Sequence, residues 1–352
     1  MPVRIRESIE QLPAYRPGKP APADAHKLSS NENPFPPLPA VIEAITEAAE
    51  SMNLYPVPDA RSVRDALAEQ HQIDANRILV THGSVMGLQQ LISAVTEPGS
   101  EIVYAWRSFE AYPLLVQMAG GTSVQVPLRD DCSHDLDAMA DAVTERTRAV
   151  IVCSPNNPTG NIVTQAEFDA FVDRIPDDVL IMLDEAYIEF VREETVDGLA
   201  AQADRDNVVV LRTFSKAYGL AGLRVGYTIG DPRILAAASN AVAPFAVDSL
   251  AQRAAVAALD SAGEVFARAE AIADRALEIH SALSERGVWV PKPHGNFIWV
   301  ATNERQTELV PEILERHRIV ARQFPDGVRI SIGTEQATEP VIAAAAEIAG
   351  SA

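Results

Sequence analysis

The chain has 352 residues, of which 47% are hydrophobic, so it can bury a sizeable core that divides between two packed domains. With 29 lysines and arginines against 49 aspartates and glutamates, its net charge of -20 disfavours nucleic acid and anionic membrane surfaces as partners. An anionic substrate must then be held by a few local arginines.

Two cysteines, Cys132 and Cys153, are too few for a disulfide framework and lack the spacing of metal ligands. They favour a reducing cytoplasm and predict no metal site. Residues 1–27 lack the apolar core of a secretory signal, and no later run reaches 18 apolar residues, so we expect no membrane span. We expect residues 1–30 to form an arm over the small domain or over a partner subunit.

Seven short apolar runs follow, and they are typical of buried strands: residues 77–81, 101–104, 123–126, 149–153, 179–183, 208–211 and 225–229. Helical patterns at residues 85–95, 135–143 and 165–175 separate several of them. This alternation predicts an α/β fold with a seven-stranded, mostly parallel sheet, formed by a large domain over residues 31–232.

The pattern then changes to alanine-rich helices over about residues 234–286. Two strand-like runs follow at residues 296–300 and 327–332, before a terminal helix. We predict a smaller α+β domain over residues 233–352, completed by the N-terminal arm.

Polar motifs follow four of the predicted strands. They are Gly83-Ser84, the turn at residues 154–160 (Ser-Pro-Asn-Asn-Pro-Thr-Gly), Asp184-Glu-Ala-Tyr187 and Arg212-Thr-Phe-Ser-Lys216. In open parallel sheets, ligands bind beyond the carboxyl ends of the strands. The four motifs therefore predict one site at that edge.

A lysine and an arginine, Lys216 and Arg224, lie eight residues apart in a glycine-rich loop. An amine whose pKa is lowered by burial or by a neighbouring cation condenses with an aldehyde cofactor, and a guanidinium binds phosphate with paired hydrogen bonds. The alternative is a solvated lysine and arginine that flank a turn.

The other motifs each fit the same cofactor chemistry. Asp184 ends an apolar run, where a protonated pyridine nitrogen would compensate its carboxylate; the alternative is an aspartate that caps the next helix. Asn157 lies in a tight turn where its amide can bind a ring hydroxyl, although such a turn alone is ordinary loop structure. Gly83, Ser84 and Val85 open a predicted helix, whose free N–H groups bind phosphate.

Taken together, these segments resemble the fold-type I pyridoxal-5′-phosphate (PLP) aminotransferases from about Ser29 to Gly333. Within that superfamily the chain is similar to the branch of histidinol-phosphate and aromatic amino acid (phenylalanine) aminotransferases. The matching segments are Asn31-Glu-Asn-Pro34, Tyr55-Pro56 and residues 327–333 (Gly-Val-Arg-Ile-Ser-Ile-Gly). Pro36 stands where this branch usually has glycine, which leaves the backbone of that loop open.

The resemblance implies roles around the cofactor. Lys216 forms the Schiff base with PLP and moves the proton, Asp184 pairs with the pyridine nitrogen, and Tyr187 binds the ring hydroxyl together with Asn157. Phe109 stacks on the pyridine ring. The phosphate is bound by Gly83, Ser84, Val85, Thr213, Ser215 and Arg224. Tyr55 reaches the cofactor of the other subunit, which implies a homodimer.

The resemblance also implies substrate-binding residues. Arg329 grips the substrate α-carboxylate or, in histidinol-phosphate enzymes, lies near the substrate phosphate, and Asn157 also contacts the substrate. Arg322 matches a phosphate-side arginine, with Tyr15 adding a hydroxyl; the alternative places Arg322 at a solvated strand end.

We expect ping-pong transfer of the amino group of phenylalanine or tyrosine to a 2-oxo acid. This choice depends on residues 106–112 (Trp-Arg-Ser-Phe-Glu-Ala-Tyr) and 212–218 (Arg-Thr-Phe-Ser-Lys-Ala-Tyr), which resemble the aromatic group. Histidinol-phosphate transamination uses the same residues and stays open. A PLP-dependent decarboxylase and a non-enzymatic PLP-binding protein are more distant alternatives, and the acidic charge disfavours the last.

Overall fold

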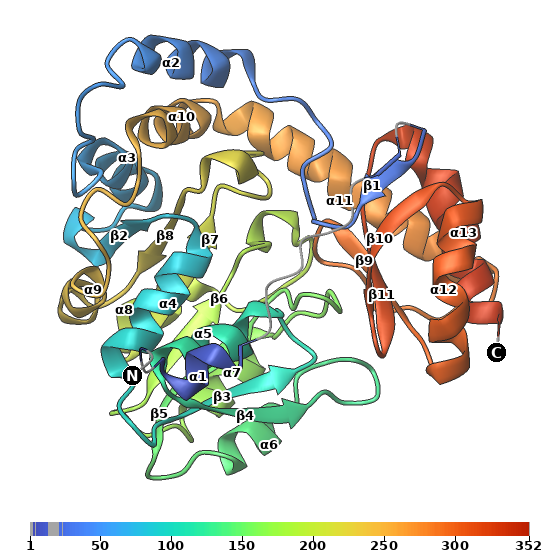
Figure 1. Cartoon of the computed structure of the whole chain (residues 1–352), viewed down its shortest axis with the longest axis horizontal. Coiled ribbons are helices and arrows are strands. Elements are labelled where there is room, and N and C mark those ends of the chain that lie inside the picture. Colours follow the sequence, from blue (N-terminus) through green and yellow to red (C-terminus); the bar gives the residue numbers. More distant parts are fainter. Residues whose placement is uncertain (1–2, 4, 13–20, 23, 352) are drawn as a thin grey trace.

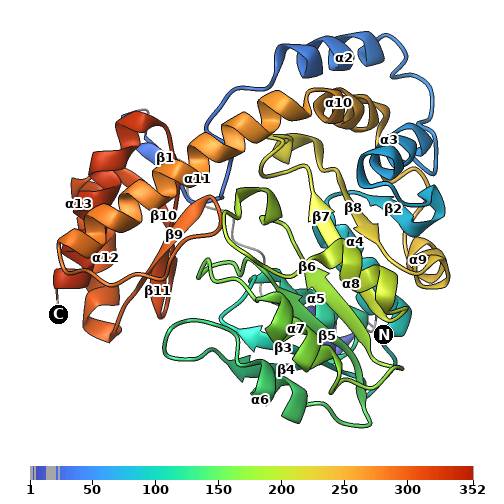
Figure 2. The same cartoon turned by 180° about the vertical axis from the view of Figure 1, so that it is seen from behind.

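The structure is a computed structural model that describes residues 3, 5–12, 21, 22 and 24–351. Figure 1 shows a large lobe built around a seven-stranded sheet and a small lobe built around a four-stranded sheet. The long helix α11 (Ala262–Glu285) reaches from one lobe to the other, as the view from behind also shows (Figure 2). Within the described ranges, no helix combines the length and the apolar character needed to cross a membrane.

The larger sheet has the strand order β2-β8-β7-β6-β5-β3-β4. Its strands are β2 (Ile78–Thr81), β3 (Glu101–Trp106), β4 (Thr122–Pro127), β5 (Thr147–Cys153), β6 (Leu180–Asp184), β7 (Val208–Thr213) and β8 (Gly226–Ile229). Neighbours from β4 to β7 run parallel, whereas β8 is antiparallel to both β7 and β2. These are the seven predicted strands, and the α/β fold class is confirmed.

Helices cover both faces of this sheet. They include α4 (Ser84–Val95), α5 (Ala111–Ala119), α6 (Leu136–Asp141), α7 (Gln165–Val172) and α8 (Gly198–Asp204). Successive strand residues point to opposite faces, so Val150 and Val152 of β5 belong to one hydrophobic cluster while Ala149 and Ile151 belong to the other. The continuous apolar runs in the sequence exist because both faces are buried.

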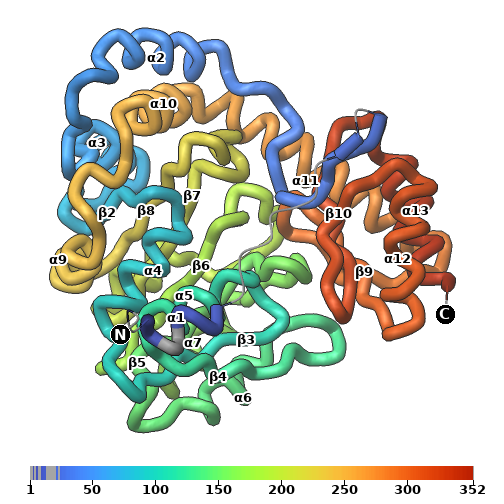
Figure 3. Tube along the Cα trace, viewed as in Figure 1, coloured from blue at the N-terminus to red at the C-terminus, as the bar shows by residue number. Residues whose placement is uncertain are grey.

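Four further helices pack beside the larger sheet, and the tube view follows their path (Figure 3). They are α2 (Pro39–Ala49), α3 (Arg61–His71), α9 (Pro232–Ser239) and α10 (Ser249–Asp260). Helix α10 contacts α2 and α3, and α9 contacts α4. The sequence assigns α9 and α10 to the predicted small domain (residues 233–352), except for Pro232, yet both helices pack on the large lobe. The domain boundary at residue 232 stays a prediction.

The smaller sheet has the order β1-β10-β11-β9. Its strands are β1 (His26–Leu28), β9 (Phe297–Ala301), β10 (Ile319–Phe324) and β11 (Gly327–Ser331), and it packs with α11, α12 (Glu304–Arg316) and α13 (Thr338–Gly350). The sequence predicted β9 and β11 but neither β1 nor β10. Parallel pairing of β1 with β10 brings the end of the N-terminal arm into the small lobe. The short helix α1 (Glu7–Glu10) instead contacts α5.

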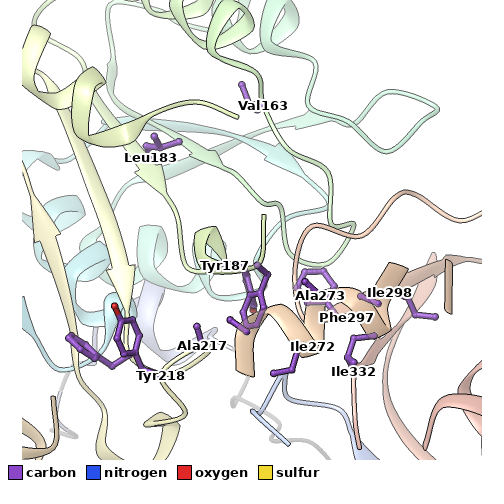
Figure 4. Packing of buried hydrophobic residues seen from close by; sticks show 14 of the residues in the cluster. Val163, Leu183, Tyr187, Ala217, Tyr218, Ile272, Ala273, Phe297, Ile298 and Ile332 are labelled. Carbon is purple, nitrogen blue, oxygen red and sulfur yellow. The ribbon is translucent and has the colours of Figure 1, made fainter. Parts of the chain in front are cut away.

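One hydrophobic cluster continues from the large sheet into the small lobe. Figure 4 shows Tyr187, Phe297 and Ala273 close together between the two lobes. The rings of Tyr187 and Phe297 meet edge to face, with centroids 5.0 Å apart. This contact joins Tyr187, which follows β6, to β9 of the small sheet.

Candidate active site

A cavity of about 290 Å³ lies at the carboxyl ends of β6 and β7, where both lobes contribute residues. The sequence-predicted residues that line it are Ser84, Val85, Phe109, Asn157, Asp184, Tyr187, Thr213, Ser215, Lys216, Arg224, Arg322 and Arg329. Gly83 lies directly behind Arg224. Tyr55 is 84% exposed and stacks on Phe245 outside the cavity, so its role toward a partner subunit stays a prediction. Tyr15 lies outside the described residues.

One end of the cavity is built to receive an anion. Helix α4 begins there at Ser84, and no side chain caps its first turn, so its free N–H groups and positive dipole end face the cavity. The Arg224 side chain lies against the same turn and donates to Ser215 Oγ at 3.2 Å. A Cβ on Gly83 would lie 2.5 Å from Arg224 Nη2, so a larger residue would displace this guanidinium from its position.

Asp184 lies in the cavity wall with only 3% of its surface exposed. Burial raises the pKa of its carboxyl, while hydrogen bonds from Tyr112 and from the Ala186 N–H act in the opposite direction. The Tyr112 hydroxyl donates to Asp184 Oδ2 at 2.6 Å and the Ala186 N–H to Oδ1 at 3.2 Å. The next helical turn, residues 188–190, has Tyr187 as its N-cap, so Asp184 does not cap it.

Lys216 points into the same cavity. Its Nζ lies 3.3 Å from the Ser30 carbonyl oxygen and 3.4 Å from that of Asn31. Burial, followed by the charges of Arg329 and Arg224, lowers the pKa of this amine to about 7. A large fraction of the amine is therefore neutral near pH 7, which is the form that attacks an aldehyde.

The small lobe supplies Arg329 from β11. Its Nη1 donates to Asn157 Oδ1 at 2.6 Å and its Nη2 to the Ser29 carbonyl oxygen at 2.7 Å. The guanidinium and the Asn157 amide are thus held together in the cavity, although they come from different lobes. Asn157 and Arg329 are both buried, at 4% and 7% exposed.

A hydrogen-bonded cluster that the sequence did not predict supports Tyr187. Asn31 Nδ2 donates to the Tyr187 hydroxyl at 2.9 Å, and Ser331 Oγ donates to Asn31 Oδ1 at 2.9 Å. Asn31 adopts a left-handed backbone conformation with φ of 53°. The Asn-Glu-Asn-Pro motif contained the only sequence signal, and it did not reveal which side chain Asn31 would contact.

Arg322 lines the cavity from within β10, so the alternative of a solvated strand end is wrong. It donates to the Glu110 carboxylate through Nε at 2.9 Å and through Nη2 at 2.7 Å. Glu110 also lines the cavity and was not predicted as a site residue. Its neighbour Phe109 packs edge to face on Tyr112, with ring centroids 5.6 Å apart.

The donor set fits PLP in three respects. The uncapped α4 terminus with Arg224 suits a phosphate, the buried Asp184 carboxylate suits a protonated pyridine nitrogen, and Lys216 carries an amine that is reactive near neutral pH. All three groups line one cavity on a parallel α/β sheet. Fold and site together define a PLP-dependent transferase.

Comparison with known proteins narrows this class. Residues 23–344 match the family "Aminotransferase class I and II", so the chain belongs to this family of PLP-dependent enzymes. The predicted enzyme class and cofactor are confirmed. A non-enzymatic role and a decarboxylase have no support from this match.

Relatives and solved structures agree with the family. The chain is 47% identical to an aromatic amino acid aminotransferase of Streptomyces avermitilis, over 96% of this chain and 95% of that protein. It is 48% identical to one of Mycobacteroides abscessus, over 95% of each chain. The crystal structure of the Sinorhizobium meliloti histidinol-phosphate aminotransferase, in complex with PLP, superposes with a TM-score of 0.88 at 27% identity, covering 98% of this chain and 97% of that one.

Proposed function

We propose that this aminotransferase acts on aromatic amino acids and transfers the amino group of phenylalanine or tyrosine to a 2-oxo acid in two half-reactions. The observation that carries the proposal is the identity of 45–48% to three relatives named aromatic amino acid aminotransferase, over 95–97% of this chain. The two-substrate cycle is a property of transamination itself.

We assign the cofactor contacts from the resemblance of the motifs, supported by the side chains that line one cavity. The phosphate is bound by Gly83, Ser84, Val85, Thr213, Ser215 and Arg224. Asp184 would bind the pyridine nitrogen, Tyr187 and Asn157 would bind the ring hydroxyl, and Phe109 would pack on the ring face. PLP, when bound, supplies an aldehyde that bonds to amines and a ring that withdraws electrons from the substrate α-carbon.

The side chains of the cavity divide the remaining work. Lys216 would hold the cofactor aldehyde through its amine, and its lowered pKa of about 7 lets the same Nζ accept the substrate α-proton near neutral pH. Asp184 stays ionised when a cation lies beside it. Arg329 holds the substrate α-carboxylate by paired hydrogen bonds, with Asn157 fixing its guanidinium.

We also propose that the enzyme is a cytoplasmic homodimer. Met52, Leu54, Tyr55 and Val57 are each more than half exposed and form an apolar run beside Phe245. Burial of such a run against a second copy removes it from water, and it places Tyr55 at the interface. The cytoplasm is supported by the two free cysteines, Cys132 and Cys153.

The second candidate function is histidinol-phosphate transamination. Arg322 in the cavity supports it, because a guanidinium is a good phosphate ligand, and so does the superposition on the Sinorhizobium meliloti enzyme. The bidentate Glu110 carboxylate disfavours it, because Arg322 is already engaged by an anion.

A panel of half-reactions tests the proposal. The purified enzyme with bound cofactor is mixed with phenylalanine, tyrosine, histidinol phosphate or glutamate, and the cofactor absorbance is followed through a single turnover. We expect the second-order rate constant of the half-reaction to be larger with phenylalanine and with tyrosine than with histidinol phosphate. A preference for histidinol phosphate would contradict the substrate assignment but leave the transaminase chemistry intact.

A further inference from the structure

The ion pair between Arg322 and Glu110 lies inside the substrate cavity. The guanidinium Nε and Nη2 each donate to a different oxygen of the Glu110 carboxylate, at 2.9 Å and 2.7 Å. This fork geometry is the strongest form of arginine–carboxylate contact. The side chains are 21% and 34% exposed, so solvent screens the pair only in part.

The two partners come from different lobes. Arg322 lies on β10, and Glu110 lies at the N-cap position of α5, next to Phe109. Because both carboxylate oxygens accept from Arg322, the pair presents nearly no net charge to the cavity. An anionic group that approaches Arg322 must displace Glu110 or lie beside its negative charge.

We propose that Glu110 is a specificity-determining residue, which neutralises Arg322 and thereby excludes substrates whose side chain ends in a phosphate. An uncharged aromatic ring forms no ion pair with Arg322, so the Arg322–Glu110 pair does not weaken its binding. This inference rests on the proposed aromatic aminotransferase function, and it assigns to Glu110 the choice between the two candidate substrates.

A second carboxylate in the cavity wall provides a matched control. Glu32 also lines the cavity, but its partner is Lys27, at 2.9 Å. Glu32→Gln therefore removes the same charge as Glu110→Gln while the pair at Arg322 stays intact. A rise in anion affinity that comes only from a lower negative charge would appear in both variants.

The test measures binding of inorganic phosphate to the enzyme with bound cofactor, by titration calorimetry at low ionic strength. The proteins are wild type, Glu110→Gln, Glu32→Gln and the double variant Glu110→Gln/Arg322→Gln. We expect Glu110→Gln to bind phosphate about tenfold more tightly, Glu32→Gln to change by less than about threefold, and the double variant to lose the gain. The ratio of kcat/KM for histidinol phosphate to that for phenylalanine should rise about tenfold in Glu110→Gln alone.

Unchanged phosphate affinity in Glu110→Gln, an equal gain in Glu32→Gln, or a gain that survives loss of Arg322 would each overturn the proposal. If Glu110→Gln does not fold, Glu110→Asp keeps the charge but shortens the side chain and breaks the fork geometry. We then expect a gain in phosphate affinity that is smaller than about tenfold. The absence of any gain would contradict the proposal. Failure of the wild type to use phenylalanine would overturn the proposed function instead, because phosphate binding is measured without turnover.

Discussion

The two ends of the cavity are built differently. The cofactor end is formed by neighbouring elements of the large lobe, with Asp184 at the end of β6, Thr213 at the end of β7 and Ser84 at the start of α4. The substrate end is assembled across the lobes, with Arg322 and Arg329 on the small sheet facing Glu110 and Asn157 of the large lobe.

We infer that the cofactor end determines how fast any substrate reacts, whereas the substrate end determines which substrates are preferred. Residues of the cofactor end act on every substrate, because all donors and acceptors react at the same group. At the substrate end, the proposed partner of Arg329 is the α-carboxylate, which histidinol phosphate lacks, and the Arg322–Glu110 pair lies in the substrate cavity. We therefore expect changes at the cofactor end to lower all rates together and changes at the substrate end to reorder the substrates.

The largest effect is expected for Lys216→Ala. Without this amine the cofactor has no covalent attachment and the α-proton has no base, so kcat should fall by at least about a thousandfold for all donors. Single-turnover absorbance with phenylalanine and glutamate measures the loss. Normal turnover in the variant would mean that another lysine carries the reaction.

Asp184→Asn should lower kcat by about a hundredfold with phenylalanine and with glutamate alike. The neutral amide no longer stabilises a protonated pyridine nitrogen, while the side-chain volume and the fold are kept. Steady-state kinetics are compared with thermal unfolding of the same variant. A loss of stability that matches the loss of rate would point to a purely structural role for Asp184.

Arg329→Ala and Arg322→Ala separate the two arginines of the substrate end. Loss of Arg329 removes the proposed carboxylate contact, so kcat/KM for phenylalanine should fall by about thirtyfold, which corresponds to about 2 kcal/mol. Arg322→Ala should change it by less than about threefold, because its guanidinium pairs with Glu110. Equal losses for phenylalanine in the two variants are incompatible with this division.

Tyr112→Phe should give the smallest effect. Its hydroxyl donates to Asp184 and lowers the pKa of that carboxyl, which burial raises. Removal of the donor raises this pKa further, so the acid limb of the pH–rate profile should move to higher pH, with a rate loss of about threefold to tenfold at neutral pH. An unshifted acid limb would show that Tyr112 does not act through Asp184.

The cofactor end was predictable because its residues follow strands directly. In a parallel sheet, apolar runs locate the strands, and polar residues just after them meet at one edge, as Asp184, Thr213 and Lys216 do. Tyr112, Glu110 and Asn31 were not predicted because they act through partners 72 to 300 positions away in sequence, such as Asp184 for Tyr112 and Ser331 for Asn31. Only tertiary packing creates those contacts.

The strands of the small sheet show the same limit. β1 has three residues and pairs with β10 from the far end of the chain, and the polar Arg322 and Gln323 interrupt the apolar pattern of β10. Short or mixed runs of this kind carry no clear period. The lining of the substrate end therefore depends on elements that the sequence pattern leaves ambiguous.

The decisive measurement identifies the lysine to which the cofactor attaches. The chain contains four lysines, Lys19, Lys27, Lys216 and Lys292. The enzyme with bound cofactor is reduced with borohydride and digested, and the peptide that carries the added pyridoxyl phosphate mass is identified by mass spectrometry. We expect the mass on Lys216 alone, because its pKa of about 7 makes it reactive at neutral pH. Labelling of Lys19, Lys27 or Lys292 with Lys216 unmodified would contradict this assignment.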